Sequence, residues 1–173
     1  CNLPKFTSND IPLFSGITKD LFPGVLLTDT DSSKANLLDA IRNCATEQAL
    51  QPTQNFITKC LELYETVQVR HGLMVVGQTF SAKSSCIRVL SSAMTKLSQG
   101  SDQQKRSAGA EAVQCNFINP KAITQGQLYG QFDHNTHEWT DGILPVIVRE
   151  CVDAHDREIS ERRWVVFDGP VDA

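Results

Sequence analysis

The sequence lacks long hydrophobic runs and any surplus of basic charge. Its longest unbroken apolar runs are only a few residues, too short to cross the hydrocarbon layer of a membrane. Its 16 lysine and arginine residues against 20 aspartate and glutamate residues give a net charge of −4, which is the wrong sign for general nucleic-acid binding. We therefore expect neither a membrane nor a nucleic acid among its partners. The 40% share of hydrophobic residues excludes a wholly disordered chain.

Closely spaced cysteine pairs are also missing, because none of the six cysteines forms a C-x-x-C pattern. Five of them lie within apolar patterns: Cys44, Cys60, Cys86, Cys115 and Cys151. In such surroundings a cysteine behaves as a small buried hydrophobic residue, so we expect free thiols in a reducing compartment. The chain begins with Cys1 instead of methionine and ends at Ala173 in a turn rich in glycine, proline and aspartate, which predicts an excerpt from a longer protein.

Apolar residues that recur at helical spacing predict most of the secondary structure. The expected helices cover residues 34–49, 54–70, 84–97 and 124–130, and a stretch capped by Thr140 or Asp141. Thr53 is suited to cap the second of them. Residues 1–30 are rich in proline, glycine and aspartate and predict a connector with short helical turns, while the polar stretch 98–110 predicts an exposed loop.

Three short apolar runs predict strands, at residues 73–76, 113–118 and 164–167. The first is bounded by Gly72 and Gly77, as expected of a strand buried in a parallel sheet. Strands that alternate with helices predict an α/β domain with a parallel sheet.

The segment from Gly77 to Ser84 fits the pattern of a phosphate-binding loop, G-x-x-x-x-G-K-[ST], at three of its four fixed positions. A predicted strand precedes it and a predicted amphipathic helix follows, which is the context that the pattern requires. Backbone N–H groups of such a loop surround phosphate oxygens at the positive end of the helix. The predicted nucleotide-binding residues are Gly77, Gln78, Thr79, Phe80, Ser81, Ala82, Lys83 and Ser84. A strand, loop and helix that contain glycine and lysine by chance remain the alternative.

Three residues of this loop have distinct expected roles. Lys83 would supply a positive charge to the β- and γ-phosphates, and the Ser84 hydroxyl would ligate Mg²⁺. Ala82 stands where the pattern has glycine, and forcing an alanine into the left-handed conformation costs about 1–2 kcal/mol. That cost either weakens nucleotide binding roughly tenfold or marks a loop that has lost its ligand.

Asp168 follows the predicted strand 164–167, in the position of the Walker B acid that holds Mg²⁺ beside a phosphate-binding loop. We predict that Asp168 and Ser84 share one magnesium ion across a common sheet. The next residue, Gly169, has no side chain, whereas hydrolytic AAA+ proteins have a glutamate there that polarises the attacking water. A positioned general base contributes about 10²–10⁴-fold in rate. We therefore expect slow hydrolysis or none, and no catalytic residue, unless Asp172 substitutes for the missing acid.

His134 and His137 are the remaining candidates for a metal site. Two histidines three residues apart, without a well-spaced third ligand, are a weak signal for zinc. We therefore expect them to have no metal-binding role.

Several blocks of the sequence resemble dynein heavy chains. They are NPK at residues 119–121 within 118–133, WTDG at 139–142, FDGPVD at 167–172, and the stretches 10–14 and 20–24. The likeness spans nearly the whole chain and is to the second AAA+ module of the motor ring, with its preceding connector, in an axonemal heavy chain. It implies a P-loop NTPase fold of AAA+ type, with a partial parallel sheet flanked by helices after an N-terminal helical connector.

The resemblance also implies domain limits. Residues 1–52 would be the connector and a helix from the preceding ring module. Residues 53–173 would be the first part of an AAA+ large subdomain that stops after the Walker B strand. AAA+ sheets have the strand order 5-1-4-3-2, and strand four would follow Ala173. Because unpaired strand edges leave backbone groups without partners, we expect the isolated 173 residues to be poorly soluble or partly molten.

The function that the resemblance implies is that of a nucleotide-binding, weakly hydrolytic or non-hydrolytic module, holding ATP or ADP with Mg²⁺. Its role would be structural and regulatory, within ATP-driven movement along microtubules. The alternatives are a nucleotide-free scaffold of the ring and an active P-loop ATPase. Implied partners are the neighbouring AAA+ modules and, through the rest of the chain, intermediate chains, light chains and microtubules. The implied location is the cytoplasm and cytoskeleton, in the ciliary axoneme.

Overall fold

The computed structural model describes residues 6–7, 9–23, 31–100, 111–157 and 161–170. The chain divides into two compact units, Cys1–Ala110 and Glu111–Ala173. Each unit is described by itself. Within the described ranges, every helix falls short of the length and hydropathy that a membrane span needs.

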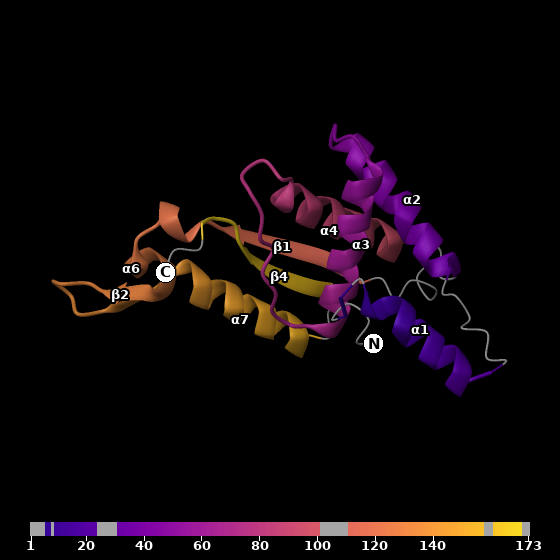
Figure 1. Cartoon of the computed structure of the whole chain (residues 1–173). Coiled ribbons are helices and arrows are strands. Elements are labelled where there is room, and N and C mark those ends of the chain that lie inside the picture. Colours follow the sequence, from indigo (N-terminus) through magenta and orange to yellow (C-terminus); the bar gives the residue numbers. More distant parts are fainter. Residues whose placement is uncertain (1–5, 8, 24–30, 101–110, 158–160, 171–173) are drawn as a thin grey trace. The chain divides into compact units, whose positions relative to one another are not determined.

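Four helices make up the regular structure described in the first unit (Figure 1). They are α1 (Asp10–Leu21), α2 (Asp31–Glu47), α3 (Gln54–Val69) and α4 (Lys83–Gln99). The last three agree closely with the helices predicted over 34–49, 54–70 and 84–97. As predicted, Thr53 caps α3, because its side chain accepts a hydrogen bond from the backbone N–H of Phe56.

Apolar stripes of α2, α3 and α4 pack together as the core of this unit. The buried residues are Leu37, Ile41, Cys44, Ala45, Ile57, Cys60, Cys86, Val89, Leu90, Ala93, Met94 and Leu97. Three of the cysteines are therefore buried as predicted. Cys115 and Cys151 of the second unit are half-buried, and all five are free thiols.

The helix α1 has no buried residue, although its sequence includes apolar side chains. Leu13 is 65% exposed and Leu21 is 68% exposed. The rings of Phe6 and Phe14 lie 5.0 Å apart and cover one another in part. Helical structure is therefore present in this range, as a single helix of 12 residues instead of the short turns predicted. That residues 1–30 are a connector stays a prediction.

The strand predicted at residues 73–76 is wrong, because residues 70–82 contain neither helix nor strand. Met74 is 75% exposed and Val76 is 85% exposed. An apolar run becomes a strand only where a partner strand offers backbone hydrogen bonds, and the described part of the first unit contains only helices. In the strand order implied by the resemblance, the partners would be strands four and five, which the predicted domain does not include.

A parallel pair of strands forms one sheet of the second unit (Figure 1). The strand β1 (Ala112–Ile118) pairs with β4 (Glu161–Phe167), in a register that joins Ala112 to Glu161 and Ile118 to Phe167. Both predicted strands are confirmed, but β4 begins three residues earlier than the apolar run. Its charged start is stabilised by Arg162, whose Nε donates a hydrogen bond to Glu111 Oε2 at 2.7 Å.

The connection between β1 and β4 contains a hairpin that the sequence analysis missed. After the short helices η2 (Pro120–Ala122) and α6 (Gln125–Tyr129), the strands β2 (Gly130–Phe132) and β3 (Trp139–Asp141) pair antiparallel. The predicted helix cap at Thr140 or Asp141 is wrong, since both residues belong to β3. The following helix α7 (Ile143–Asp156) has Gly142 at its N-cap. A parallel β1–β4 sheet with helices confirms the predicted α/β class.

The polar loop predicted at 98–110 lies mostly outside the described residues, and α4 extends into its start, to Gln99. Asp172, the proposed substitute acid, also lies outside them.

Candidate phosphate-binding site

The loop from Gly77 to Lys83 closes around a single ammonium group. Lys83 Nζ donates hydrogen bonds to the carbonyl oxygens of Gly77 at 2.9 Å and Gln78 at 2.7 Å. It also lies 3.3 Å from Ser81 Oγ. Across the same turn, the backbone N–H of Ser81 donates to the Gln78 carbonyl at 3.3 Å. The sequence pattern therefore corresponds to a curled loop with its lysine held at the centre.

The helix α4 starts directly from this loop. Lys83 is its first residue and Ser84 its second. The N-cap residue Ala82 makes no side-chain capping hydrogen bond, since an alanine has no polar atom to offer. The N-terminal end of a helix carries a partial positive charge and unpaired N–H groups, which suits an anion.

Ala82 adopts the left-handed conformation, with φ 60° and ψ 25°. This is the conformation that the glycine of the pattern would provide without steric cost. The prediction that alanine is forced to positive φ at this position is confirmed, at a cost of about 1–2 kcal/mol.

Phe80 also has positive φ, at 65°, and its side chain is fully exposed. A bulky residue in this region of backbone space is an outlier. The sequence analysis assigned Phe80 to the loop but gave no signal for its conformation. Gly77, Gln78 and Ser81 contribute the oxygens that hold Lys83, whereas Thr79 and Phe80 form the turn between Gln78 and Ser81.

Gly77 lies where the loop crosses itself. A Cβ atom at this position would be 2.8 Å from Ser81 Oγ and 3.6 Å from Lys83 Cδ. A side chain at Gly77 would therefore displace the Ser81 hydroxyl that lies beside Lys83 Nζ.

Asp168 occupies the carboxyl end of the sheet in the second unit. Its backbone N–H donates to the Ile118 carbonyl at 2.8 Å, which continues the β1–β4 ladder by one residue. Ligands of open α/β folds bind outside the carboxyl ends of the strands. The acid therefore stands at the sheet edge where the Walker B pattern predicts it.

The side chain of Asn119 lies close to Gly169, the residue after Asp168. A Cβ atom placed on Gly169 would lie 2.9 Å from Asn119 Oδ1, so the amide of Asn119 is beside the position where a glutamate would be needed for hydrolysis. The same Oδ1 accepts a hydrogen bond from the backbone N–H of Lys121 at 3.1 Å. The sequence analysis missed Asn119 as a candidate site residue. Asn119 could have been recognised in the sequence because it is a polar residue directly after a predicted strand.

The predicted site residues thus form two groups, one in each unit. Residues 77–84 form the loop and helix start in the first unit, and Asp168 lies with Asn119 and Gly169 in the second. The meeting of Ser84 and Asp168 at one magnesium ion stays a prediction.

His134 and His137 lie in the turn between β2 and β3. The Asp133 carboxylate accepts hydrogen bonds from the backbone N–H groups of Asn135 at 2.7 Å and Thr136 at 3.0 Å. These bonds lower the pKa of Asp133, chiefly through Thr136. Among the described residues, no cluster of three or more histidine, cysteine or acidic side chains is placed to hold a metal.

Asp141 has a structural role in the same unit. Its carboxylate accepts hydrogen bonds from Arg149 Nη1 at 2.5 Å and from Trp139 Nε1 at 2.8 Å. The Arg149 guanidinium, followed by the Trp139 contact, lowers the pKa of Asp141 to about 2. The carboxylate therefore joins β3 to α7.

Comparison with known proteins gives the family. Residues 1–84 match the family described as "Hydrolytic ATP binding site of dynein motor region". The chain is 50% identical over 174 residues to dynein axonemal heavy chain 1 of Homo sapiens. The aligned part covers 99% of this chain and 4% of that protein. It is 46% identical over 171 residues to dynein axonemal heavy chain 12 of Mus musculus, covering 99% of this chain and 5% of the relative. The chain thus spans only about a twentieth of the length of these relatives. It belongs to the dynein heavy chain family, as a segment of the motor region with an α/β fold of AAA+ type.

Proposed function

We propose that this segment is a nucleotide-binding module of the dynein motor ring, the second AAA+ module with its preceding connector. It would hold ATP or ADP with Mg²⁺ and hydrolyse it weakly or not at all. The observation that carries this proposal is the loop closed around Lys83 at the start of α4. Domain limits at residues 52 and 53 are part of the proposal.

The residues of the loop suit a polyphosphate in kind and position. Lys83 Nζ already has a fixed place among the Gly77 and Gln78 carbonyls and the Ser81 hydroxyl. A phosphate oxygen would compete for the same ammonium group, with the N-terminal end of α4 adding a second favourable charge. The remaining loop residues, Thr79, Phe80 and Ala82, would line the phosphates with their backbone.

Magnesium would be held by oxygen ligands, which a hard cation prefers. Ser84 in the first turn of α4 and Asp168 at the end of β4 provide a hydroxyl and a carboxylate. The ion would neutralise phosphate charge, while the protein groups fix the orientation of the polyphosphate.

Weak hydrolysis follows from the residue after Asp168. Gly169 offers no carboxylate to orient water, and its neighbour Asn119 carries a neutral amide, which is a poor general base. The matched family is described as hydrolytic, but the matched residues end at Ser84 and so exclude Asp168 and Gly169. A nucleotide-free scaffold is the second candidate, and the strained Ala82 is the observation that favours it.

At the scale of the whole heavy chain, we infer a part in ATP-driven movement along microtubules in the ciliary axoneme. The support is that the relatives at 42–50% identity are axonemal dynein heavy chains. The partners would be the neighbouring AAA+ modules, with intermediate chains, light chains and microtubules reached through other parts of the chain.

The test is to count bound nucleotides per heavy chain in the complete motor region, after denaturation and chromatography. Lys83→Ala should remove one nucleotide per chain, because the loop loses the charge at its centre. Lys96→Ala is the matched control, since Lys96 lies in the same helix and pairs with Glu47 instead. Full nucleotide content in Lys83→Ala would favour the scaffold, and brisk turnover by this module would refute weak hydrolysis.

A further inference from the structure

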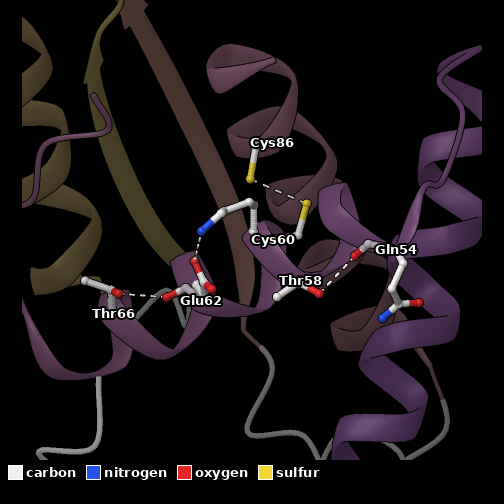
Figure 2. Close-up of polar contacts among 7 residues, drawn as sticks. Gln54, Thr58, Cys60, Glu62, Thr66 and Cys86 are labelled. Carbon is white, nitrogen blue, oxygen red and sulfur yellow. Dashed lines mark hydrogen bonds and ion pairs between the residues drawn. The ribbon is translucent and has the colours of Figure 1, made fainter. Parts of the chain in front are cut away.

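Two buried thiols join α3 to α4 in the first unit. Cys60 is 0% exposed and Cys86 is 7% exposed, and their sulfur atoms lie 3.4 Å apart (Figure 2). Cys86 is in the first turn of α4, three residues after Lys83. Neither thiol has a part in the proposed nucleotide site.

We propose that Cys60 and Cys86 are a redox modification site, which forms a reversible disulfide when a low-molecular-weight disulfide such as oxidised glutathione is present. A disulfide bond is about 2.05 Å long, so the two sulfur atoms need to approach by only about 1.4 Å. The bond would link α3 covalently to the start of α4.

Exposure makes Cys86 the attacking thiol. Cys86 is 7% exposed, whereas Cys60 is 0% exposed, so a disulfide in solution reaches the Cys86 sulfur first. Cys60, 3.4 Å away, is then in place to attack the mixed disulfide.

The reaction balances as two successive exchanges. Cys86 gives its proton to water, and its thiolate attacks one sulfur of oxidised glutathione, forming a mixed disulfide and releasing one glutathione thiolate. Cys60 then loses its proton to that thiolate and attacks the Cys86 sulfur, releasing the second glutathione as a thiolate that takes up a proton from water. Two protein thiols are oxidised by two electrons, and one glutathione disulfide is reduced to two thiols.

Access of glutathione to Cys86 requires α3 to move away locally. Two side chains of α3 are fully buried, Ile57 and Cys60. Four more apolar side chains are half-buried, Phe56, Leu61, Leu63 and Val67, and the movement must break their contacts. Other contacts drawn in Figure 2 lie within α3 itself: Thr58 Oγ1 donates to the Gln54 carbonyl, Thr66 Oγ1 to the Glu62 carbonyl, and Lys59 pairs with Glu62. They stabilise the helix without attaching it to α4, which favours its opening as a unit.

The experiment uses the intact heavy chain, incubated with either oxidised or reduced glutathione. Remaining thiols are alkylated under denaturing conditions, and peptides are examined by mass spectrometry. We expect a cross-linked peptide pair containing Cys60 and Cys86, two hydrogens lighter than the separate peptides, only under oxidising conditions. Adding dithiothreitol should remove it.

Two variants test the assigned order. Cys60→Ser should stop the reaction at a glutathione adduct on Cys86, whereas Cys86→Ser should leave Cys60 unmodified. Cys44→Ser is the matched control, because Cys44 is a buried thiol of α2 in the same core and its loss should leave the Cys60–Cys86 link intact. Complete alkylation of both cysteines in the unmodified chain under oxidising conditions, or a stable adduct without the link, would overturn the proposal.

Discussion

At Ala82 the backbone has the conformation that the glycine of the phosphate-loop pattern would adopt without steric cost. Its left-handed backbone at φ 60° is retained although alanine is the residue present. The strain of about 1–2 kcal/mol is on the order of a tenfold change in an equilibrium constant. If nucleotide binding holds this backbone more firmly than the free loop does, the strain appears as weakened affinity.

Replacing Ala82 with glycine should therefore tighten nucleotide binding up to about tenfold, because glycine adopts positive φ without the steric cost. The measurement is a titration of the complete motor region with a fluorescent nucleotide. Ala49→Gly is the matched control, since Ala49 also has positive φ, at 54°, but lies at the end of α2. It should leave the affinity unchanged. If Ala82→Gly and the unmodified chain had equal affinity for the nucleotide, strain at Ala82 would not weaken nucleotide binding.

At the scale of elements, Gly142 controls how the hairpin meets α7. A Cβ atom there would lie 2.4 Å from the Leu128 carbonyl oxygen and 2.6 Å from the Gly130 nitrogen. Both are backbone atoms, which cannot move aside as a flexible side chain can. Asp141 and its partners Arg149 and Trp139 then fasten β3 to the helix.

Gly142→Ala should displace β2 and β3 and destabilise the second unit by about 1–3 kcal/mol, the usual cost of overpacking. We expect faster limited proteolysis of the heavy chain within residues 130–142. Gly72→Ala is the matched control and should be cleaved at the same rate as the unmodified chain, because a Cβ atom at Gly72 meets nothing within 4 Å. Unchanged cleavage of Gly142→Ala would show that the backbone can give way.

Elements with a repeated pattern were predictable from the sequence, and those that depend on a partner were not. The apolar residues that recur at helical spacing predicted the positions of α2, α3 and α4 to within a few residues, because the backbone hydrogen bonds of a helix join residues close in sequence. The segment 73–76 has the composition of a strand but lacks a partner strand. The hairpin of β2 and β3 was missed because strands of three residues carry too little alternation to be recognised. The loop around Lys83 was predictable because its fixed residues and spacing encode a known backbone path.

At the scale of the whole molecule, the described structure leaves many large apolar side chains open. Leu13 and Leu21 of α1 and Met74 and Val76 of the segment before the loop are each at least 65% exposed. Exposed apolar surface of this kind marks places where other parts of a protein pack. This chain covers 4–5% of the length of its relatives.

The isolated 173 residues should therefore bind the dye ANS strongly and unfold over a broad temperature range, as partly molten chains do. The complete motor region should bind little dye per residue. Fluorescence and calorimetry on the two proteins make the comparison. A sharp, cooperative unfolding transition of a monomeric 173-residue chain would contradict this expectation.

The central claim is that the Lys83 loop and Asp168 hold one magnesium-bound nucleotide. The most direct measurement is an experimental structure of the intact motor region in ATP and Mg²⁺. The account predicts nucleotide density with its phosphates at Lys83 Nζ and an ion within reach of both Ser84 and Asp168. The account would be contradicted if Ser84 and Asp168 were too far apart to share one ion, or if the loop held no nucleotide at saturating ATP.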